Sequence, residues 1–528
     1  MKKHGIVVIG AGHNGLVAAC YLAEAGHHVM VLEKRNIVGG SCVTEETFPG
    51  FKISSAAYVN SLFLNKIVDD LRLRDYGYEV LLRNPSSFTP LPDGRYLMLG
   101  PNKEFNLEEI AKFSKYDARK YAKYEKVLSE IASFIDTTLT MEPPGLPPQN
   151  LSDLTQYLKL AGKLLGLSQK SKITLAKLIS YDARLFLDEW FESDALKATL
   201  LTDSIIGATN FSGYVLLHHV MGEAGGVRGV WGYQRGGMGN ITQALKKAAE
   251  DRGVKIYTNH EVKQIKVENG AVRKVDFANG GIVFPDIVVS NTDPKLTFLK
   301  LLGPDNCPKS FLRKIANLDF SSASMKVNLA LSGVPKFFCI DEEDVGPQHR
   351  GTIHIAPGVS YITKAAREGK RGIPSTEPIL ELTIPSAVDN TLAPAGKHIM
   401  NIFVQFAPYH LREGSWDEIK QKYFEKNIMD ALKKYIVNIE NIIEGVQILS
   451  PLDLEREFSL TEGNIFHGAM TLGQLFSMRP VRGYANYRTP VKGLYLCGAG
   501  AHPGGGVMGA AGYNAARAVL EDVQKEKP

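Results

Sequence analysis

Residues Ile6-Val7-Val8-Ile9-Gly10-Ala11-Gly12-His13-Asn14-Gly15 decide the fold of this 528-residue chain. The four apolar residues at the start are typical of a parallel strand that is buried on both faces. Gly10 permits a tight turn, Gly12 lets the backbone approach a pyrophosphate, and Gly15 lets the next helix pack closely on the strand. The stretch therefore predicts the first half of a dinucleotide-binding βαβ unit, with a helix N-terminus facing the phosphates.

The residues that follow complete the same unit. Small and apolar side chains form a helical inner face over 14–25, and Gly26 is placed to end that helix. A second apolar strand, Val29-Met30-Val31-Leu32, is followed by Glu33. A carboxylate at this position accepts hydrogen bonds from both ribose hydroxyls and repels a 2′-phosphate. The unit therefore favours FAD or NAD over NADP.

Two further glycine turns favour FAD over NAD. Lys34 and its neighbours lead to Gly39-Gly40-Ser41, a pattern that resembles the extended motif of the glutathione-reductase-like flavoproteins, in which the paired glycines contact the phosphates. Near the other end of the chain, an apolar strand runs into Gly498-Ala499-Gly500, and the glycine-rich turn 503–512 begins another helix. The free backbone N–H groups of such a helix start bind an anion or a carbonyl oxygen. Two turns so far apart suit a long cofactor, and a purely structural helix cap is the alternative for the second.

The middle of the chain predicts further parts of the same domain and a second domain. Apolar and alternating segments at 254–257, 261–265 and 272–275, with the turn Asn269-Gly270, predict a small β-meander that precedes a buried strand at 287–289. Patterns at 325–331 and 399–404 predict strands of a mixed sheet. The predicted fold is α/β, or α+β overall. Its FAD-binding domain is discontinuous, over 1–75, 229–299 and 481–528, and the interwoven substrate domain spans 76–228 and 300–480, with a helical part at about 105–200.

Five motifs in order resemble the phytoene-desaturase-like FAD-dependent oxidoreductases, and they span nearly the whole chain. They are GAGHNGL at 10–16, EKRNIVGGSC at 33–42, GGMGNITQAL at 236–245, GNIFHGAM at 463–470 and LYLCGAGAHPGGGVMGAAG at 494–512. Within that family the chain most resembles the branch named pyridine nucleotide-disulfide oxidoreductase domain-containing protein, which is related to the carotenoid desaturases and isomerases. The resemblance implies a glutathione-reductase-like Rossmann domain, with a mixed sheet and helices over the substrate.

The turn chemistry and the resemblance together assign the contacts of FAD. The resemblance implies that the backbone of Val262 holds the adenine, that Gly498 lies near the phosphates and the ribityl chain, and that Val507 and Met508 lie beside the pyrimidine end of the flavin. The full set of expected cofactor residues is Gly10, Gly12, His13, Asn14, Gly15, Glu33, Lys34, Gly39, Gly40, Ser41, Val262, Gly498, Ala499, Gly506, Val507 and Met508. No metal site is expected.

The cysteines argue against a dithiol relay. The five cysteines show no CxxC spacing, and the partner that a reductase dithiol would place five residues after Cys42 is Thr47. Gly236-Gly237-Met238-Gly239 lacks the preceding strand and the following acid of a second nucleotide unit. Cys42 is therefore interpreted as a packed small residue rather than a redox group, and electrons must pass to something other than a stably bound nicotinamide.

The expected chemistry is hydride transfer to flavin from an apolar, polyene-like or isoprenoid-like substrate, by desaturation or isomerisation. Lys326 is the candidate catalytic residue: it either holds a water near the flavin N5, as a lysine does in the related amine oxidases, or points to solvent. His467 either lines the pocket or caps a turn. Two alternative functions stay open. One is a flavin amine oxidase, and the other is a binding or regulatory protein that keeps the fold and uses FAD structurally or not at all, as the Rab dissociation inhibitors do.

Composition limits the partners. A net charge of +5 from 61 basic and 56 acidic residues is too dilute to indicate a nucleic-acid surface, and no run of about 18 apolar residues indicates a membrane span. Leucines and lysines mix over 151–178, where the one acid is Asp153. This basic amphipathic helix either lies on an anionic bilayer or packs its leucines on the core. We expect a cytoplasmic protein, peripheral on the inner face of a membrane if that contact forms, or a mitochondrial matrix protein if the source is eukaryotic.

Overall fold

The computed structural model describes residues 4–207, 210–224, 227–321 and 324–525. One of its two large sheets has five strands, ordered β11-β2-β1-β15-β21, and every neighbouring pair is parallel. Its strands are β1 (Gly5–Ile9), β2 (His28–Leu32), β11 (Lys255–Tyr257), β15 (Ile287–Ser290) and β21 (Leu494–Leu496). The apolar segments predicted to be buried parallel strands therefore form one sheet, as expected.

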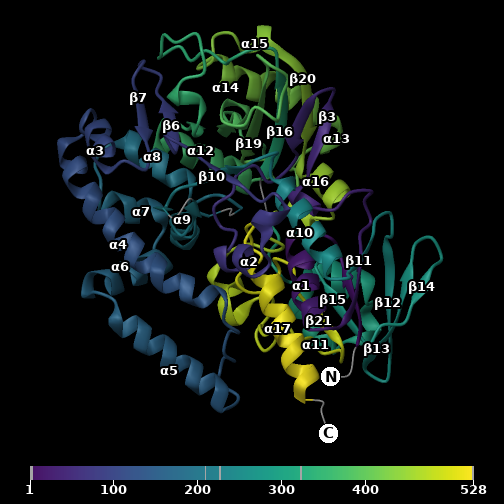
Figure 1. Ribbon diagram of the computed structural model, residues 1–528. Coiled ribbons are helices and arrows are strands. Elements are labelled where there is room, and N and C mark those ends of the chain that lie inside the picture. The colour runs from purple at the N-terminus through teal and green to yellow at the C-terminus, as the bar shows by residue number, and fades with distance from the viewer. Residues whose placement is uncertain (1–3, 208–209, 225–226, 322–323, 526–528) are drawn as a thin grey trace.

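Three helices cover this sheet, and Figure 1 shows them grouped near both termini. They are α1 (His13–Glu24), α10 (Gly239–Asp251) and α17 (Ala510–Lys525). The predicted β-meander is confirmed in two of its three segments, which form β12 (Val262–Glu268) and β13 (Ala271–Phe277) of an antiparallel sheet. The third predicted segment, 254–257, is instead the edge strand β11 of the parallel sheet, and β14 (Ile282–Val283) completes the meander. Asn269 and Gly270, which join its first two strands, both have left-handed backbones, as a tight hairpin turn requires.

The second large sheet has seven strands, ordered β20-β16-β19-β18-β17-β6-β7. Its one parallel pair is β17 with β6, and its other pairs are antiparallel. The strands are β6 (Ser87–Pro90), β7 (Tyr96–Leu99), β16 (Ser324–Leu331), β17 (Thr352–Ile355), β18 (Ile379–Thr383), β19 (His398–Gln405) and β20 (Ile443–Leu449). The prediction of a mixed sheet, with strands at 325–331 and 399–404, is confirmed.

The two faces of this sheet differ in chemistry although both are buried. Side chains alternate along a strand, so Met325, Val327 and Leu329 of β16 join an apolar core on one face. Lys326 and Asn328 point to the opposite face. The sheet therefore carries a polar inner surface, which becomes important for the site below.

The apolar face is covered by helices, among them α13 (Trp416–Tyr423) and α14 (Met429–Lys433). Further helices and strands lie around the two sheets. They are α2 (Asn65–Asp70), α11 (Lys309–Ala316), α12 (Val359–Lys370), α15 (Ile439–Ile442), α16 (Pro451–Phe458), β3 (Thr44–Phe48), β4 (Phe51–Ser54), β5 (Val80–Leu82), β8 (Glu223–Ala224), β9 (Val227–Arg228) and β10 (Gly232–Gln234).

A helical region lies to one side of both sheets, on the left in Figure 1. Its helices are α3 (Lys103–Ala111), α4 (Lys115–Leu139), α5 (Leu151–Gly166), α6 (Gln169–Ser180), α7 (Ala183–Asp188), α8 (Asp194–Thr202) and α9 (Gly213–Val220). The helical part predicted at about 105–200 begins with α3 and α4, which are two separate helices. The division occurs because Ser114 caps α4, accepting a hydrogen bond from the Asp117 N–H at 3.0 Å.

The prediction of a single amphipathic helix over 151–178 is wrong, because a cap divides this segment into two helices as well. Leu167 has an extended backbone, and the Ser168 hydroxyl accepts a hydrogen bond from the Ser171 N–H, so α5 ends and α6 begins there. Within the described ranges, no helix is long and apolar enough to cross a membrane.

Candidate active site

The predicted phosphate-binding turn lies between β1 and α1. Gly10 has a left-handed backbone (φ +92°), and the Gly12 carbonyl accepts a hydrogen bond from the Leu16 N–H at 3.0 Å. A Cβ atom on Gly15 would lie 2.2 Å from the Gly10 carbonyl oxygen, so no larger residue fits there without moving the backbone. The N-terminus of α1 therefore opens onto this turn.

Glu33 lies directly after β2 and is buried. Its Oε2 accepts a hydrogen bond from the Ala11 N–H and its Oε1 accepts one from the Arg35 N–H, both at 2.9 Å. A carboxylate has about four acceptor sites. Glu33 is thus fixed beside the glycine turn with acceptor capacity left for the hydroxyls of a ribose.

The paired glycines lie against the first turn. The Gly39 N–H donates to the Ala11 carbonyl at 2.9 Å, and Gly12 and Gly39 form an isolated parallel bridge. Gly39 and Gly40 have φ values of +134° and +56°, which favour glycine. Ser41 follows in the short helical turn Gly40–Cys42. These two motifs, apart in sequence, form one surface.

Val262 and Lys34, two further residues expected to contact the cofactor, both lie near Glu33, but their surroundings differ. The His260 N–H donates to the Glu33 carbonyl at 2.8 Å, which holds the start of β12, and so Val262, close to Glu33. The Lys34 Nζ donates to the Ser459 Oγ at 2.6 Å. Val262 therefore lies close to Glu33, and its contact with adenine stays a prediction, while the Lys34 ammonium is directed toward a neighbouring loop.

The C-terminal turn meets the N-terminal one. A Cβ atom on Gly498 would lie 2.8 Å from the Asn291 carbonyl oxygen, and one on Gly512 would lie 2.1 Å from the Asn14 carbonyl oxygen. Both approaches require glycine because the opposing atoms are backbone. The close approach at Gly512 lets α17 pack on the start of α1, so the two predicted cofactor turns share one corner.

Two half-buried histidines at this corner are neutral. Burial lowers the pKa of His13 and of His467 to about 4. His13 Nε2, His467 Nδ1 and Asn14 Oδ1 have no hydrogen-bond partner in the described part of the chain. Buried polar atoms are normally satisfied, so these three fit contacts to a bound group. The glycine turns, Glu33 and these atoms together fit FAD.

Cys42 is a packed residue, as interpreted from the sequence. It is buried, its thiol contacts the Met238 carbonyl at 3.4 Å, and burial raises its pKa to about 12. All five cysteines are free. Among the described residues, no group of three or more His, Cys, Asp or Glu side chains could hold a metal ion.

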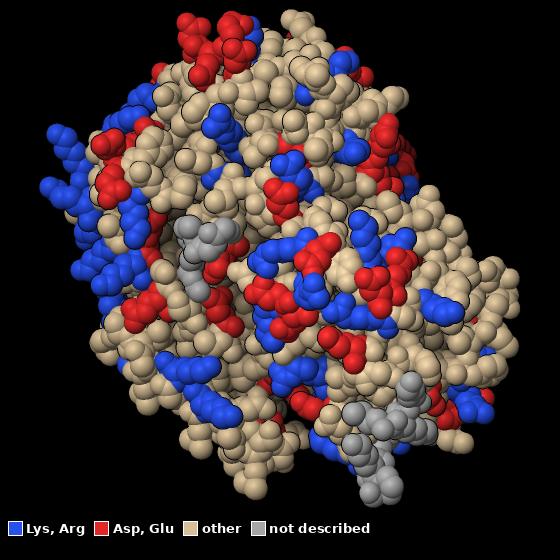
Figure 2. Space-filling model, in the orientation of Figure 1, with Lys and Arg blue, Asp and Glu red and all other residues tan. Residues whose placement is uncertain are grey.

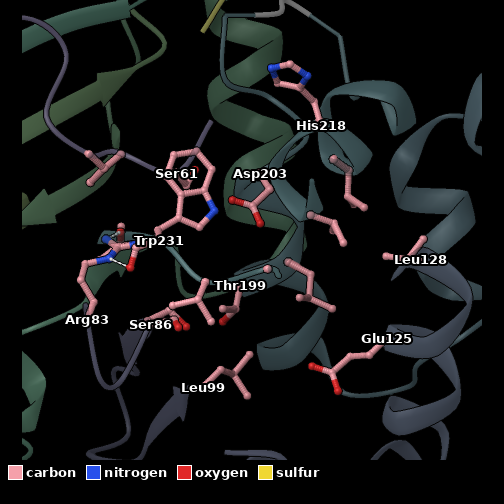
Figure 3. Close-up of a pocket in the computed structure, with 18 of the residues that line it drawn as sticks. Ser61, Arg83, Ser86, Leu99, Glu125, Leu128, Thr199, Asp203, His218 and Trp231 are labelled. Carbon is pink, nitrogen blue, oxygen red and sulfur yellow. Dashed lines mark hydrogen bonds between the residues drawn. The ribbon is translucent and has the colours of Figure 1, made fainter. Parts of the chain in front are cut away.

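A cavity of about 800 Å³ begins at the C-terminal turn, where Gly506 and Val507 line it, while Met508 is buried behind them. It extends between the polar face of the seven-stranded sheet and the helices α4, α8 and α9 (Figure 3). Among the apolar side chains on its wall are Leu62, Leu99, Leu128, Leu200, Ile206, Leu216, Val230 and Phe466.

The cavity wall also carries charged side chains. Glu125 and Asp203 project into it from the helical side, opposite Arg83 (Figure 3). The Arg83 side chain is held by hydrogen bonds to the Trp231 carbonyl at 3.3 Å and the Thr352 hydroxyl at 2.6 Å. Lys103, Lys126 and Glu381 complete the charged lining.

Lys326 does not point to solvent, so that alternative is wrong. Its side chain is 2% exposed, and its Nζ lies 3.9 Å from the centre of the Tyr58 ring, with no hydrogen-bond partner in the described residues. Burial lowers its pKa well below the usual value, and the nearby Glu381 opposes this only in part. Tyr58 lines the cavity whereas Lys326 does not. Its catalytic role stays a prediction.

Arg479 is a structural residue of the site that the sequence did not reveal. It is 2% exposed, and its guanidinium donates to the Ala499 carbonyl, at 2.9 Å from Nε, and to the Gln474 carbonyl at 3.0 Å. It also donates to the carbonyls of Phe466 and Gly468. Arg479 therefore ties the segment that carries His467 to the C-terminal turn that begins at Gly498. His467 itself adopts a left-handed backbone inside that segment and is not on the cavity wall.

Comparison with known proteins identifies the family. The model of the flavin containing amine oxidoreductases matches residues 15–520. The chain is 41% identical to pyridine nucleotide-disulfide oxidoreductase domain-containing protein 2 of Rattus norvegicus, over 99% of this chain and 94% of that protein. It is 28% identical to one of the subunits of the limonene dehydrogenase of Castellaniella defragrans, over 99% and 95% of the two chains. It is 27% identical to the chloroplastic prolycopene isomerase of Daucus carota, over 100% and 81%.

A solved structure supports the same fold. A triple mutant of putrescine oxidase superposes with a TM-score of 0.61 at 14% identity, covering 99% of both chains. The resemblance to desaturase-like flavoproteins, stated from five sequence motifs, is confirmed. The chain belongs to the flavin containing amine oxidoreductase family, and it is an FAD-dependent oxidoreductase.

Proposed function

We propose that this protein acts on a substrate with an apolar, isoprenoid-like carbon skeleton, either desaturating it with FAD as hydride acceptor or isomerising it with no net transfer of electrons. The observation that carries the proposal is the cavity of about 800 Å³ that starts at Gly506 and Val507, the residues expected beside the flavin. Leucines from α4 and α8 line its length. Limonene and prolycopene appear in the names of relatives that align with nearly this whole chain, which supports the same substrate class.

The chain's own residues would hold the cofactor and shape the reaction. The first glycine turn and Gly39-Gly40 would hold the pyrophosphate, Glu33 the ribose, and Gly506 and Val507 the ring end. Bound flavin supplies a two-electron acceptor for hydride. The apolar wall then positions a C–H bond and excludes water. Arg83, fixed by two hydrogen bonds, orients any polar end of the substrate.

Amine oxidation is the second candidate. The acidic side chains Glu125 and Asp203 on the cavity wall favour it, because a carboxylate attracts an ammonium group. Arg83, Lys103 and Lys126 line the same cavity and offset these charges. We therefore place the amine substrate second.

Anaerobic reduction of the flavin separates the two candidates. The FAD-loaded protein is mixed without oxygen with limonene, prolycopene or phytoene, and separately with putrescine or cyclohexylamine, while the flavin absorbance is recorded. We expect bleaching with at least one isoprenoid and none with the amines. Bleaching by amines alone would establish amine oxidation instead.

We also propose that α5 docks on an anionic membrane, from which an apolar substrate would enter. The helix stands away from the body of the protein (Figure 1). The alternative that the leucines of 151–178 pack on the core is wrong for α5, whose Leu151, Leu158 and Leu165 are 81%, 73% and 73% exposed. It holds in α6, where Leu175 and Leu178 are buried. Exposed leucines along one side of a helix that also carries Lys159 and Lys163 suit an interfacial helix.

The cavity reaches the surface on the side of this helical region. Lys103 and Lys126 belong to its lining and are exposed. Exposed basic residues continue along α4 at Lys115, Arg119 and Lys123, and Figure 2 shows basic side chains gathered at left over α3 and α4. A basic surface beside the opening supports contact with anionic lipid headgroups.

Vesicle flotation tests this proposal. We expect the protein to float with phosphatidylserine-containing vesicles and less with neutral ones. Replacement of Leu151, Leu158 and Leu165 by serine should abolish flotation, because it removes the exposed apolar area that enters the interface. A matched control replaces the exposed Leu472 by serine. The proposal is rejected if the unmodified protein stays in the soluble fraction with both vesicle types.

A further inference from the structure

One transverse row of the seven-stranded sheet carries polar side chains on the face toward the cavity. In the register of the sheet, Lys326 on β16 lies opposite Phe403 on β19, Phe403 opposite Glu381 on β18, and Glu381 opposite His354 on β17. Directly opposed residues point to the same side of a sheet. Glu381 and His354 reach the cavity wall, whereas Lys326 lies behind the ring of Tyr58.

Glu381 is the buried carboxyl of this row. It is 3% exposed, and its Oε2 accepts a hydrogen bond from the Tyr58 hydroxyl at 3.2 Å. Its Oε1 has no hydrogen-bond partner among the residues the structure describes. A buried oxygen left unsatisfied on a cavity wall is costly, and it suits an atom that exchanges a proton with a bound molecule.

Several charged and titratable groups face Glu381 from the elements packed around it. They are Tyr58, Arg83, Asp203, Lys326 and His354. Burial raises the pKa of Glu381 to about 8, and the charge of Asp203 acts in the same direction. The hydrogen bond from Tyr58 and the charges of Lys326 and Arg83 oppose the shift. His354 is neutral, because burial lowers its pKa to about 3.

Building on the proposed function, we propose that Glu381 is the catalytic base that removes the second hydrogen of a desaturation, as a proton. Desaturation breaks two C–H bonds on adjacent carbons. One hydrogen leaves with both bonding electrons to the flavin, and the positive charge that develops acidifies the neighbouring C–H bond. Glu381 Oε1 takes that second hydrogen as a proton, and the electron pair of its C–H bond becomes the new C=C π bond. Tyr58 is a positioning residue that holds Oε2.

Glu381→Gln tests the assignment in the FAD-loaded protein. The probe is the isoprenoid that bleaches the unmodified enzyme. We expect flavin reduction to slow about 10²–10⁴-fold, with the probe's binding constant unchanged. In the unmodified enzyme the rate should rise as the pH increases through about 8, since only the carboxylate accepts a proton. Glu381→Gln should lose this pH dependence. Tyr58→Phe should move its midpoint upward, because the Tyr58 hydrogen bond lowers the pKa of Glu381.

Infrared spectroscopy of the resting protein gives a readout that needs no turnover. We expect a protonated-carboxyl C=O band that disappears as the pH rises through about 8, is absent in Glu381→Gln and is unchanged in the control Glu444→Gln, whose carboxylate pairs with Lys397 at the surface. Absence of the band in the unmodified protein would overturn the inference.

The kinetic outcomes separate this inference from the proposed function. If no isoprenoid bleaches the unmodified enzyme, desaturation fails as the proposed function and the inference fails with it. If an isoprenoid bleaches the unmodified enzyme and Glu381→Gln at the same rate and with the same pH profile, the inference alone is overturned.

Discussion

Glu33→Ala is expected to weaken FAD binding about 10²–10⁴-fold, since each hydrogen bond from a ribose hydroxyl to a carboxylate contributes about 1.5–3 kcal/mol. The loss also leaves the Ala11 and Arg35 N–H groups without the acceptor that fixes the glycine turn. The measurement is a titration of the apoprotein with FAD, followed by flavin fluorescence.

The control for this experiment is Glu24→Ala. Glu24 is an exposed acid at the end of α1 in the same βαβ unit, so its removal should leave FAD affinity unchanged. An unaltered dissociation constant in Glu33→Ala would contradict the assignment of the ribose site and, with it, the placement of the adenine end near Val262.

Arg479→Met is expected to lower the free energy of unfolding by about 3–5 kcal/mol. It should also weaken FAD binding, because the C-terminal turn that begins at Gly498 loses the side chain that fastens it. The substitution keeps the length of the side chain but leaves the carbonyls of Phe466, Gln474 and Ala499 buried without their donor. Thermal unfolding followed by circular dichroism, with and without added FAD, measures both effects.

Arg482→Met is the matched control, because Arg482 lies three residues away, is exposed and makes one hydrogen bond, to the Leu146 carbonyl. We expect its unfolding temperature and flavin content to match those of the unmodified protein. Equal unfolding curves for the two variants would mean that Arg479 does not fasten the turn.

Much of the FAD domain could be predicted because its motifs are local. A βαβ unit places strand, glycine turn, helix and acid within about 30 residues, so the chain from Ile6 to Glu33 specifies its own geometry. The turn at 503–512 could be linked to it by family resemblance alone. The structure supplies the physical link, the close approach of Gly512 to the Asn14 carbonyl.

The substrate cavity could not be built from the sequence in the same way, because its residues come from segments that only the tertiary fold brings together. No sequence motif links the cavity residues Tyr58, Arg83, Asp203 and Glu381, which lie far apart in the chain. One local signal was available: Glu381 is the lone charged residue in the apolar strand Ile379–Thr383. A charge inside a buried strand is rarely structural unless it is paired, and this pattern would have singled out Glu381.

In the helical region, a local pattern led to a wrong prediction. A continuous apolar periodicity over 151–178 favoured one helix, but the cap at Ser168 divides it. Periodicity reports which residues share a face, not whether that face is covered. Exposure of Leu158 and burial of Leu178 follow from where α5 and α6 lie relative to α4, which the sequence does not encode locally.

The most direct test of the whole account is a crystal structure of the FAD-loaded protein with the isoprenoid that bleaches it, solved with the flavin reduced. We predict that the substrate lies in the cavity, with the flavin ring beside Gly506 and Val507 on one side of the oxidised carbon and the carboxyl of Glu381 within reach of the adjacent carbon on the other. Substrate density outside this cavity, or a flavin ring remote from Val507, would contradict the account.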